Sequence, residues 1–528
     1  MARRAARDGF SVLVVEQHDV SSGTTSASTR LIHGGLRYLE HGELGLVRES
    51  LREREALLAI APHLVEPLRL YLPIYRGARR PRWQVRVGMA LYDLLSLGKS
   101  LPHHEMLSRE ELVRRLPGLA ADGLVGGASY FDAQVAFPER LVVENLLDAA
   151  AHGASVLTHT QATRIVVDGG AATGVEWRRA DGTAGCTAAR CVVNAAGPWL
   201  DRVAASVSGA PREPRLVDGT KGSHLVVAPF PGAPTSGVYA EAARDGRPFF
   251  VLPWNGLYLI GTTDVRYAAD PAEAAIDGDE LDYLASETER LFPGCGGIAP
   301  RVLYTQAGVR ALPHSPHAAP GAITRRHAIH AHRGAHGVYS IVGGKLTTHR
   351  SLAAQVMGRL ARDGFMPADG EAERVRRAGR LPGAIAGRER GALEAELAGS
   401  FGERHAARLI RTYGRIAERL LRDAGLRPEL AAPAAPGSAL LRVELVYALE
   451  SEWAASLIDL LQRRVMLGLD ADFGLGAADA ASRALVELGV WDAARAADEL
   501  AAYRRHAETH RAAAARDAET VKGRWARS

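Results

Sequence analysis

Apolar and polar positions in the first part of the chain alternate in a way that predicts an α/β domain. A short helix over Ala2–Arg7 is followed by Gly9, which can cap it, and then by an apolar strand over Ser11–Val15 that ends in Glu16. A helix, a strand and an acid in this order are typical of a doubly wound sheet. Further elements are predicted as helices over 42–60 and 139–151 and as strands near 155–158, 163–167 and Cys191–Val193.

The pattern changes twice beyond residue 210. Strand-like runs at 224–228, 249–252 and 257–260 predict a second sheet that would cover the ligand, and the chain returns to the first sheet at Tyr339–Val342. Pro, Arg and Glu become frequent near 366–384, and from there the pattern is helical. One helix face in this last part is predicted to carry Leu445, Leu449, Trp453, Leu457 and Leu460.

These patterns predict an α/β fold with a Rossmann-like nucleotide-binding sheet, an interleaved antiparallel-sheet cap domain over the substrate, and an α-helical C-terminal domain. Small residues at Asn194–Trp199 follow a buried strand, which is where ligands bind in open α/β sheets. The expected boundaries are 1–365 for the α/β region, with nucleotide-binding parts at about 1–75, 139–210 and 305–365 and cap parts at about 76–138 and 211–304, then a linker at 366–383 and the helical domain at 384–528.

Composition narrows the classes of protein and partner. The 528 residues are 47% hydrophobic and 24% charged, and the net charge of +5 suits an anionic substrate or an anionic membrane surface. This charge is too small to indicate nucleic acid. Cys186, Cys191 and Cys295 lack metal-site spacing, so we expect no metal site and reduced cysteines in a cytoplasmic protein. No apolar run approaches the roughly 20 residues that span a bilayer, and the Arg-rich start does not fit a signal peptide.

Residues 21–40, SSGTTSASTRLIHGGLRYLE, carry the strongest chemical signal in the chain. Small and hydroxylated residues bring backbone N–H groups close to a phosphate without a bulky side chain in the way. They are followed by His33, the pair Gly34–Gly35, Arg37 and Tyr38. Two glycines let the backbone lie flat against a ligand, and an arginine can fork onto an oxyanion. Taken alone, the segment is also compatible with an ordinary surface loop.

The letters of this segment resemble a known family. TSASTRLIHGGLRYLE is similar to the segment that threads past FAD in the flavin-dependent glycerol-3-phosphate dehydrogenases, a branch of the glycine/D-amino-acid-oxidase-like flavoproteins. The similarity runs from about residue 10 to about 350 and more faintly to about 500. Further motifs resemble the family in the family's order: KGSH (221–224), GTTD (261–264), GVR (308–310), ITR (323–325) and GGKLTT (343–348).

The resemblance implies an FAD-binding fold and a respiratory oxidoreductase of glycerol metabolism. Such an enzyme oxidises sn-glycerol 3-phosphate to dihydroxyacetone phosphate by hydride transfer to FAD and passes the electrons to a membrane quinone. Two alternatives stay open: a flavin-dependent glycerol-3-phosphate oxidase that uses oxygen, and a truncated, non-catalytic remnant unable to hold FAD. A homo-oligomer is compatible with the sequence but is not indicated by it.

The resemblance also implies which side chains bind the substrate. His33 and His224 are the candidate bases, because an imidazole titrates near working pH, and the residues do not decide between them. Each histidine is equally compatible with a hydrogen-bonded position in the core. Arg310 is expected to polarise the alkoxide as charge develops. The residues expected around the phosphate and the alcohol are Arg37, Tyr38, Thr263, Arg310, Arg325 and Lys345.

For FAD, the resemblance implies contacts from separate segments of the chain. Glu16 would hold the adenosine ribose, the loop at 24–28 would cradle the pyrophosphate, and a cationic Lys345 would favour the anionic reduced flavin. The full expected set is Glu16, Thr24, Thr25, Ser26, Ser28, Gly34, Gly35, Leu36, Ala195, Ala196, Gly197, Trp199, Gly344, Lys345, Leu346 and Thr347.

Residues 76–99 combine basic, aromatic and apolar side chains, which is the composition of a helix lying in a membrane interface. A cap-domain helix with snorkelling arginines would have the same composition. The resemblance favours the membrane interpretation, with peripheral attachment to the cytoplasmic face. The basic residues include Arg79, Arg80, Arg82, Arg86 and Lys99, and Trp83, Val85, Val87, Met89, Leu91 and Tyr92 lie between them.

One part of the family's pattern is absent. In the family, a strand and G-x-G-x-x-G stand about 20 residues before the ribose acid, and counting back from Glu16 runs off the chain. The helix after those glycines would neutralise the pyrophosphate. We therefore expect the chain expressed as written to be poorly soluble or flavin-poor, and an in-frame upstream extension to restore the glycine motif.

Overall fold

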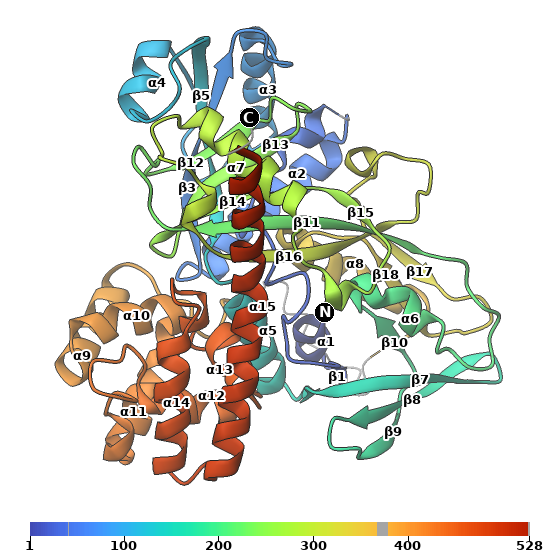
Figure 1. Ribbon diagram of the computed structural model, residues 1–528. Helices are drawn as coiled ribbons and strands as arrows, with labels where there is room; N and C mark the ends of the chain where they lie inside the picture. Colours follow the sequence, from blue (N-terminus) through green and yellow to red (C-terminus); the bar gives the residue numbers. More distant parts are fainter. Residues whose placement is uncertain (41, 367–378, 526–528) are drawn as a thin grey trace.

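The computed structural model describes residues 1–40, 42–366 and 379–525, with side chains in the last helix as far as residue 511. The predicted fold class is confirmed, because an α/β part, a largely antiparallel roof with one parallel strand pair, and a C-terminal helical domain are all present (Figure 1). Most of the expected linker at 366–383 lies outside the described residues.

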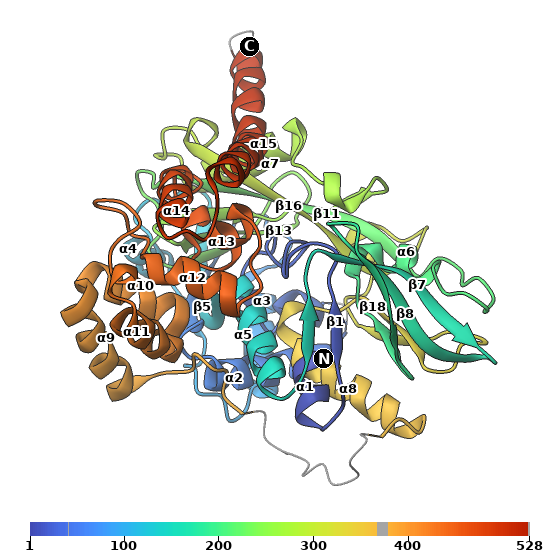
Figure 2. The same ribbon diagram turned by 90° about the horizontal axis from the view of Figure 1, so that it is seen from below.

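The parallel strands of the nucleotide-binding part form two separate small sheets. β1 (Leu13–Val15) pairs with β6 (Ser155–Leu157) in one of them. β18 (Val338–Val342) pairs with the parallel β10 (Val192–Asn194) and the antiparallel β17 (Ala328–Ala331) in the other. The two sheets lie next to each other in both views (Figures 1 and 2). All three side chains of β1 are only half-buried, in keeping with a strand that is paired on one side.

Helices and a third small sheet surround these strands. The strand predicted near 163–167 is part of β7 (Thr160–Asp168), which pairs with β8 (Ala171–Arg179) in an antiparallel sheet. β8 also pairs with β9 (Ala184–Ala188). The helices of the α/β region are α1 (Ala2–Arg7), α2 (Leu44–Ile60), α3 (Arg82–Leu95), α4 (Arg109–Arg115), α5 (Pro138–Ala151), α6 (Leu200–Ala204), α7 (Gly278–Leu291) and α8 (His349–Arg362).

The roof is one ten-stranded sheet built from several parts of the chain. Its strands are β2 (Leu31–Ile32), β3 (Val65–Tyr75), β4 (Glu105–Leu107), β5 (Leu124–Val135), β11 (Val217–Val227), β12 (Gly237–Glu241), β13 (Pro248–Trp254), β14 (Leu257–Gly261), β15 (Val265–Tyr267) and β16 (Val302–Pro313). The longest pairings are β3 with β5 and β11 with β16. β3 and most of β16 lie within stretches expected to bind the nucleotide, so those stretches also build the roof.

The C-terminal domain is helical, and its last helix reaches back to the roof. Its helices are α9 (Gly387–Phe401), α10 (Glu403–Tyr413), α11 (Ala417–Leu426), α12 (Arg442–Ser451), α13 (Leu457–Arg463), α14 (Leu475–Glu487) and α15 (Ala493–Trp525). His510 of α15 lies with Nδ1 3.1 Å from the Thr305 carbonyl of β16. The C-terminal end of α15 projects from the body in Figure 2.

One prediction for this domain is wrong. The leucine pattern from Leu445 to Leu460 was expected on a single helix face, but α12 ends at Ser451 and α13 begins at Leu457. Ser456 starts the second helix, because its side chain accepts a hydrogen bond from the Asp459 backbone in a capping box. The apolar spacing matches one helix by coincidence, while a local cap divides it into two.

Helix α5 carries four buried charged side chains that connect it to different parts of the chain. The pairs are Glu139 with Arg30, Arg140 with Glu452, Glu144 with His63, and Asp148 with both Arg3 and Arg7. Arg30 also donates to the Ala136 carbonyl at 3.1 Å and to the Ser26 carbonyl at 3.0 Å. Because these elements contact the roof, the helical domain and α1, α5 links the three parts.

We expect Glu139→Gln to lower the free energy of unfolding by about 3–5 kcal/mol, because Arg30 would remain buried without its counter-charge. Both side chains of this pair have 0% exposure. Glu176→Gln is the matched control, since its partner Arg164 is 51% exposed and Glu176 is 37% exposed. The control should cost less than about 1 kcal/mol. Equal losses for the two variants in urea unfolding would contradict the role of α5.

Candidate active site

Three arginines from separate segments converge on one buried carboxylate. Asp264 lies between β14 and β15, and its side chain is 2% exposed. Arg310 Nη1 of β16 is 3.2 Å from its Oδ1. Arg325 Nη2 and Arg247 Nη2 are 3.1 Å and 3.2 Å from its Oδ2. Burial acts to raise the pKa of Asp264, but the surrounding guanidinium groups outweigh it and hold that pKa below its usual range.

Glycine at position 222 makes room for Arg310. Gly222 lies on β11, the strand that pairs with β16, and a Cβ on it would lie 2.1 Å from Arg310 Nη2. The guanidinium group of Arg310 therefore occupies the space that a side chain at position 222 would fill. Its Nη2 donates to Thr262 Oγ1 at 3.0 Å, and burial lowers the pKa of Arg310 to about 10. The motifs KGSH, GTTD and GVR thus form one structural unit.

Thr263 is placed differently from the substrate contact expected for it. Its hydroxyl donates to Glu280 at 2.6 Å and accepts from the Ser223 backbone at 2.9 Å, so it is committed to the cap. The preceding Thr262 accepts from Arg310 instead. The two neighbouring threonines therefore have different partners, and Thr262 rather than Thr263 contacts the cations through its side chain.

A second group of expected residues lies beside the arginines. Lys345 Nζ is 4.4 Å from the ring centroid of Tyr38 and donates to Ser50 Oγ at 2.6 Å. Arg37 Nη2 donates to the Gly321 carbonyl at 3.2 Å. Burial lowers the pKa of Lys345 to about 8, and burial raises the pKa of Tyr38, which stays a protonated donor.

The two candidate bases are both neutral near pH 7. Burial lowers the pKa of His33 to about 4, with help from the charge of Lys345, and lowers the pKa of His224 to about 3. Thr29 Oγ1 lies 2.9 Å from His224 Nε2, while His224 Nδ1 is buried without a partner among the described residues. The His33 backbone donates to Thr347 Oγ1 at 3.3 Å. The geometry does not choose between the two histidines.

Residues expected to hold FAD lie at the ends of the parallel strands. Glu16 follows β1, Ala195–Gly197 follow β10, and Gly344 lies two residues beyond β18. Ala195 and Gly344 are exposed, and a Cβ on Gly197 would meet no atom within 4 Å, so there is open space at these positions. Burial raises the pKa of Glu16. An acid beside small residues at strand ends suits a ribose and a flat ring, so these residues fit FAD.

The loop at 24–28 uses its hydroxyls within the protein. Thr24 Oγ1 donates to the Val309 carbonyl at 2.6 Å, and Ser26 Oγ donates to the Ser21 carbonyl at 2.7 Å. Ser28 Oγ accepts a 3.3 Å hydrogen bond from the Arg30 backbone. The Thr24 bond holds the loop against β16, and the hydroxyl protons of Thr24 and Ser26 are already donated within the protein. Phosphate contacts at these two positions would therefore come from backbone N–H groups, whereas the Ser28 hydroxyl can still donate its proton.

Gly34 and Trp199 also have protein partners. A Cβ on Gly34 would lie 2.3 Å from the Tyr92 hydroxyl, to which the Gly34 backbone donates at 3.0 Å. Its small size therefore serves contact with the cap, while Gly35 supplies a left-handed turn with φ of 78°. Trp199 Nε1 donates to Asp270 at 3.2 Å. The remaining expected residues Thr25, Leu36, Ala196 and Leu346 are half-buried.

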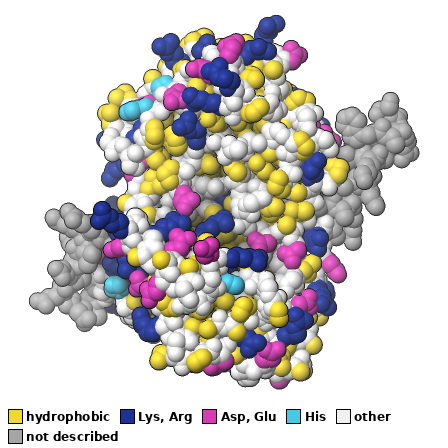
Figure 3. Space-filling view, turned by 90° about the vertical axis from the view of Figure 1, so that its left-hand side faces the viewer, with side chains coloured by type: hydrophobic (Ala, Val, Ile, Leu, Met, Phe, Trp, Pro, Cys, Tyr) yellow, Lys and Arg dark blue, Asp and Glu magenta, His cyan; other side chains and the backbone are white. Residues whose placement is uncertain are grey.

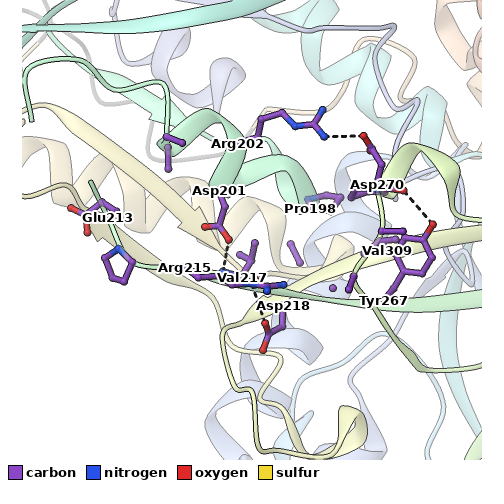
Figure 4. Close-up of a pocket in the computed structure, with 18 of the residues that line it drawn as sticks. Pro198, Asp201, Arg202, Glu213, Arg215, Val217, Asp218, Tyr267, Asp270 and Val309 are labelled. Atoms are coloured by element: carbon purple, nitrogen blue, oxygen red, sulfur yellow. Dashed lines mark hydrogen bonds and ion pairs between the residues drawn. The ribbon is translucent and has the colours of Figure 1, made fainter. Parts of the chain in front are cut away.

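A separate groove of about 560 Å³ lies between α6 and the roof strands β11 and β15 (Figure 4). Pro198 and Val309 line it, each next in sequence to a residue expected in the site. Two of the charged side chains that line the groove form an ion pair: Arg202 Nη2 lies 2.8 Å from Asp270 Oδ2. The arginines around Asp264 do not line this groove, which is therefore distinct from the cation cluster.

Sequence reasoning missed Arg247 and Asp264 as members of the site. Asp264 ends the motif GTTD, so an acid at the end of a run of small residues was an available signal. Arg247 follows a turn and belongs to no motif, and its place beside Asp264 depends on how β13 and β14 are paired. Only the tertiary structure could have identified it.

The fold and the site define an FAD-dependent oxidoreductase. The family model described as FAD dependent oxidoreductase matches residues 1–350, and the one described as C-terminal domain of alpha-glycerophosphate oxidase matches residues 376–496. A glycerol-3-phosphate dehydrogenase of Synechocystis sp. is 39% identical over 499 residues, covering 90% of this chain and 88% of that protein. The aerobic glycerol-3-phosphate dehydrogenase of Escherichia coli is 36% identical, covering 89% of this chain and 91% of its own length.

A solved structure agrees with these sequences. The glycerol-3-phosphate dehydrogenase from Bacillus halodurans complexed with FAD has a TM-score of 0.75 and 25% identity, covering 96% of this chain and 92% of that one. The chain belongs to the FAD-dependent glycerol-3-phosphate dehydrogenase family, and the expectation that FAD is its cofactor is confirmed.

Acid should destabilise the fold through His224. Its pKa is about 3 in the folded chain and about 6.5 when unfolded, so the unfolded chain binds the proton first as pH falls. The contribution of His224 to the free energy of unfolding is complete above pH 6.5 and is lost progressively as pH falls toward the folded pKa. By pH 4.5 the loss is about 2–3 kcal/mol. His224→Gln cannot take this proton, so urea unfolding at pH 7 and 4.5 should show a smaller loss for the variant. Equal losses would contradict the burial of a neutral His224.

Proposed function

We propose that the chain oxidises sn-glycerol 3-phosphate to dihydroxyacetone phosphate with FAD as the hydride acceptor, and that a membrane quinone takes the electrons. The names of the relatives from Synechocystis sp. and Escherichia coli support the substrate. A D-erythritol 1-phosphate dehydrogenase of Brucella abortus is 39% identical and covers 68% of this chain. A polyol phosphate is the chemistry that these names have in common.

The arginines around Asp264 carry the proposal. Three guanidinium groups and one carboxylate leave a net charge of +2, which matches a phosphate dianion in magnitude. Arg325 Nη1 is buried without a hydrogen-bond partner among the described residues, so it is a donor in need of an acceptor. Arginine recognises phosphate through paired N–H groups, and each charge-assisted hydrogen bond contributes about 1.5–3 kcal/mol.

The remaining chemistry divides between cofactor and chain. When bound, FAD supplies the group that accepts the hydride from C2 of the substrate. The chain binds the phosphate, orients the secondary alcohol and accepts the hydroxyl proton. His33 and His224 are the two candidate acceptors: burial keeps both imidazoles neutral at pH 7, and the same lowering of the pKa makes each a weaker base than an exposed histidine. Arg310 and Lys345 place positive charge where the oxygen becomes negative.

The acceptor is tested by following both electron routes in the same sample. Purified chain supplied with FAD should lose its flavin absorbance when glycerol 3-phosphate is added without oxygen. In air, a soluble quinone analogue should be reduced in preference to formation of hydrogen peroxide. Peroxide equal to the substrate consumed would instead identify an oxidase, in line with the C-terminal match to alpha-glycerophosphate oxidase.

We expect Arg310→Ala to lower kcat/KM for glycerol 3-phosphate by about tenfold or more, through lost charge-assisted hydrogen bonds. Arg266→Ala is the control, since Arg266 lies on β15 beside the site but pairs with Asp218 at 3.5 Å and is 37% exposed. Flavin absorbance should be the same in both variants. An unchanged kcat/KM in Arg310→Ala would remove this residue from the substrate site.

We also propose that α3 attaches the protein peripherally to an anionic membrane. Among the described residues, no helix combines the length and hydropathy that crossing a membrane requires. α3 instead buries Val85, Met89 and Tyr92 and exposes an apolar edge that includes Trp83 at 69% and Val87 at 60%. Figure 3 shows Lys and Arg among hydrophobic side chains in the upper part of one face. Exposed apolar and basic side chains together suit a lipid interface.

Ion pairs in the structure show which basic residues of 76–99 are available to bind lipid headgroups. Arg80 is paired with Glu40 and Glu241, and Lys99 is paired with Asp93. Arg76, Arg79, Arg82 and Arg86 are exposed and form no ion pair with a described residue. The electrostatic part of the attachment is assigned to Arg79, Arg82 and Arg86, which lie in α3 or shortly before it, whereas Arg76 directly follows β3.

Replacing Arg79, Arg82 and Arg86 with Gln should weaken binding to phosphatidylserine-containing vesicles on the order of a hundredfold, at about 1 kcal/mol for each charge. The remaining binding should depend less on salt. Cosedimentation with vesicles measures both effects.

A control removes equal charge elsewhere, with Arg164, Arg178 and Arg179 changed to Gln on the exposed strands β7 and β8. This variant should bind vesicles as the parent does. A parent chain that never sediments with the vesicles, or two variants that are released equally, would rule out α3 as the attachment site.

A further inference from the structure

Glu16 lies where the segments that follow β1 and β6 stay hydrogen-bonded to each other. The Glu16 backbone donates to the Leu157 carbonyl at 2.9 Å, and the Thr160 backbone donates to the Glu16 carbonyl at 2.8 Å. The His159 backbone donates to the His18 carbonyl at 2.7 Å. Residues 16–20 and 157–160 are thus joined by backbone hydrogen bonds and are called here the ribose edge.

A segment of the C-terminal helical domain, Trp453–Arg464, holds this edge from outside. Arg464 Nη1 and Nη2 donate to the two oxygens of Asp19 at 2.9 and 2.6 Å. Arg463 Nε donates to Asp19 Oδ2 at 2.6 Å. Asp19 has no exposed side-chain surface in its pair with Arg464, so these bonds are shielded from water.

The same segment of the helical domain also contacts Thr158 and His159 of the edge. His159 Nε2 lies 2.9 Å from Asp459 Oδ2, and the Thr158 hydroxyl donates to the Trp453 carbonyl at 3.3 Å. Val20 and Val156 pack in one apolar cluster with Trp453. The helical domain thus contacts both chain segments of the ribose edge, through charge, hydrogen bonds and apolar packing.

Asp19, His159 and Asp459 are close enough together to suggest a metal site, but their partners argue against one. Both oxygens of Asp19 already accept guanidinium N–H groups, and Arg463 Nη2 donates to Asp459 Oδ1 at 2.6 Å. The two carboxylates are balanced by two arginines from adjacent positions of the chain. A cation would have to displace buried hydrogen bonds that the site already makes.

We infer that Trp453–Arg464 acts as a clamp that fixes the ribose edge, so that retention of FAD depends on the C-terminal helical domain. The inference rests on the proposed contact between Glu16 and the adenosine ribose. Asp19 is a positioning residue in this arrangement: it does not contact the cofactor but holds, three residues away, the acid that does. The helical domain then has a function in the cofactor site although it lies outside the α/β region.

Hydrogen exchange of the full chain without added FAD tests the clamp directly. Asp19→Asn should speed amide exchange about tenfold in peptides covering residues 11–28 and 153–161. Glu444→Gln is the matched control, since Glu444 is also fully buried and pairs with Arg408 inside the helical domain. The control should speed exchange within the helical domain and leave both peptides unchanged.

His159→Asn keeps the test decisive if Asp19→Asn unfolds the whole chain. His159 is 33% exposed by its side chain, and asparagine tolerates its positive φ of 50° but is too short to reach Asp459. It should raise exchange in the same two peptides by a smaller factor. Parent-like exchange there in this variant, or in a folded Asp19→Asn, would overturn the clamp.

A titration with FAD, monitored by the quenching of flavin fluorescence, tests the clamp separately from the function proposed above. Asp19→Asn should raise the Kd for FAD about tenfold over that of Glu444→Gln. Equal Kd values in these two folded variants would overturn the link to cofactor retention. A parent chain that binds no FAD while showing the expected exchange pattern would support the structural clamp and overturn its link to cofactor retention.

Discussion

The buried charges of α5 are the interaction on which the arrangement of the molecule depends. A buried charge without a partner costs several kcal/mol, so each pair allows only one placement of the element that carries the partner. Glu139 holds Arg30 beside the roof, Arg140 holds Glu452 of the helical domain, and Asp148 holds α1 through two arginines. Glu144 bonds to His63 and also accepts from the Gly383 backbone at 2.9 Å, which brings in the chain that leads to the helical domain.

Buried carboxylates that pair with arginines also occur at the two places where function is proposed. Asp264 gathers arginines from a loop, a turn and a strand, none of which is near the others in sequence. Asp19 gathers two neighbouring arginines from the C-terminal domain. In each case one small carboxylate, shielded from water, fixes several long cationic side chains that would otherwise sample many rotamers. The cost of burying the carboxylate is offset by several charge-assisted bonds rather than one.

Much of the site could be read from local sequence because glycine and cation stand together in short motifs. Gly222 in KGSH and Arg310 in GVR lie on paired strands, and the glycine is required because the arginine occupies the space of its side chain. Thr263 shows the limit of this reasoning. The motif GTTD offers two threonines, and which one faces the cations depends on the direction of the backbone, which no residue type reveals. Arg247 had no local signal at all.

The sequence by itself determined the α/β class, the family, the helical C-terminal part and most of the cations, because apolar periodicity and short motifs depend on neighbouring residues. The tertiary structure decided which strands form the roof, where α12 ends and α13 begins, and that Asp264 and Asp19 are centres of ion pairing. It also separated the arginines of residues 76–99 that pair with a described residue from those that do not. These properties depend on contacts between residues tens to hundreds of positions apart, and the energy of a buried charge is set by the partner that folding brings to it.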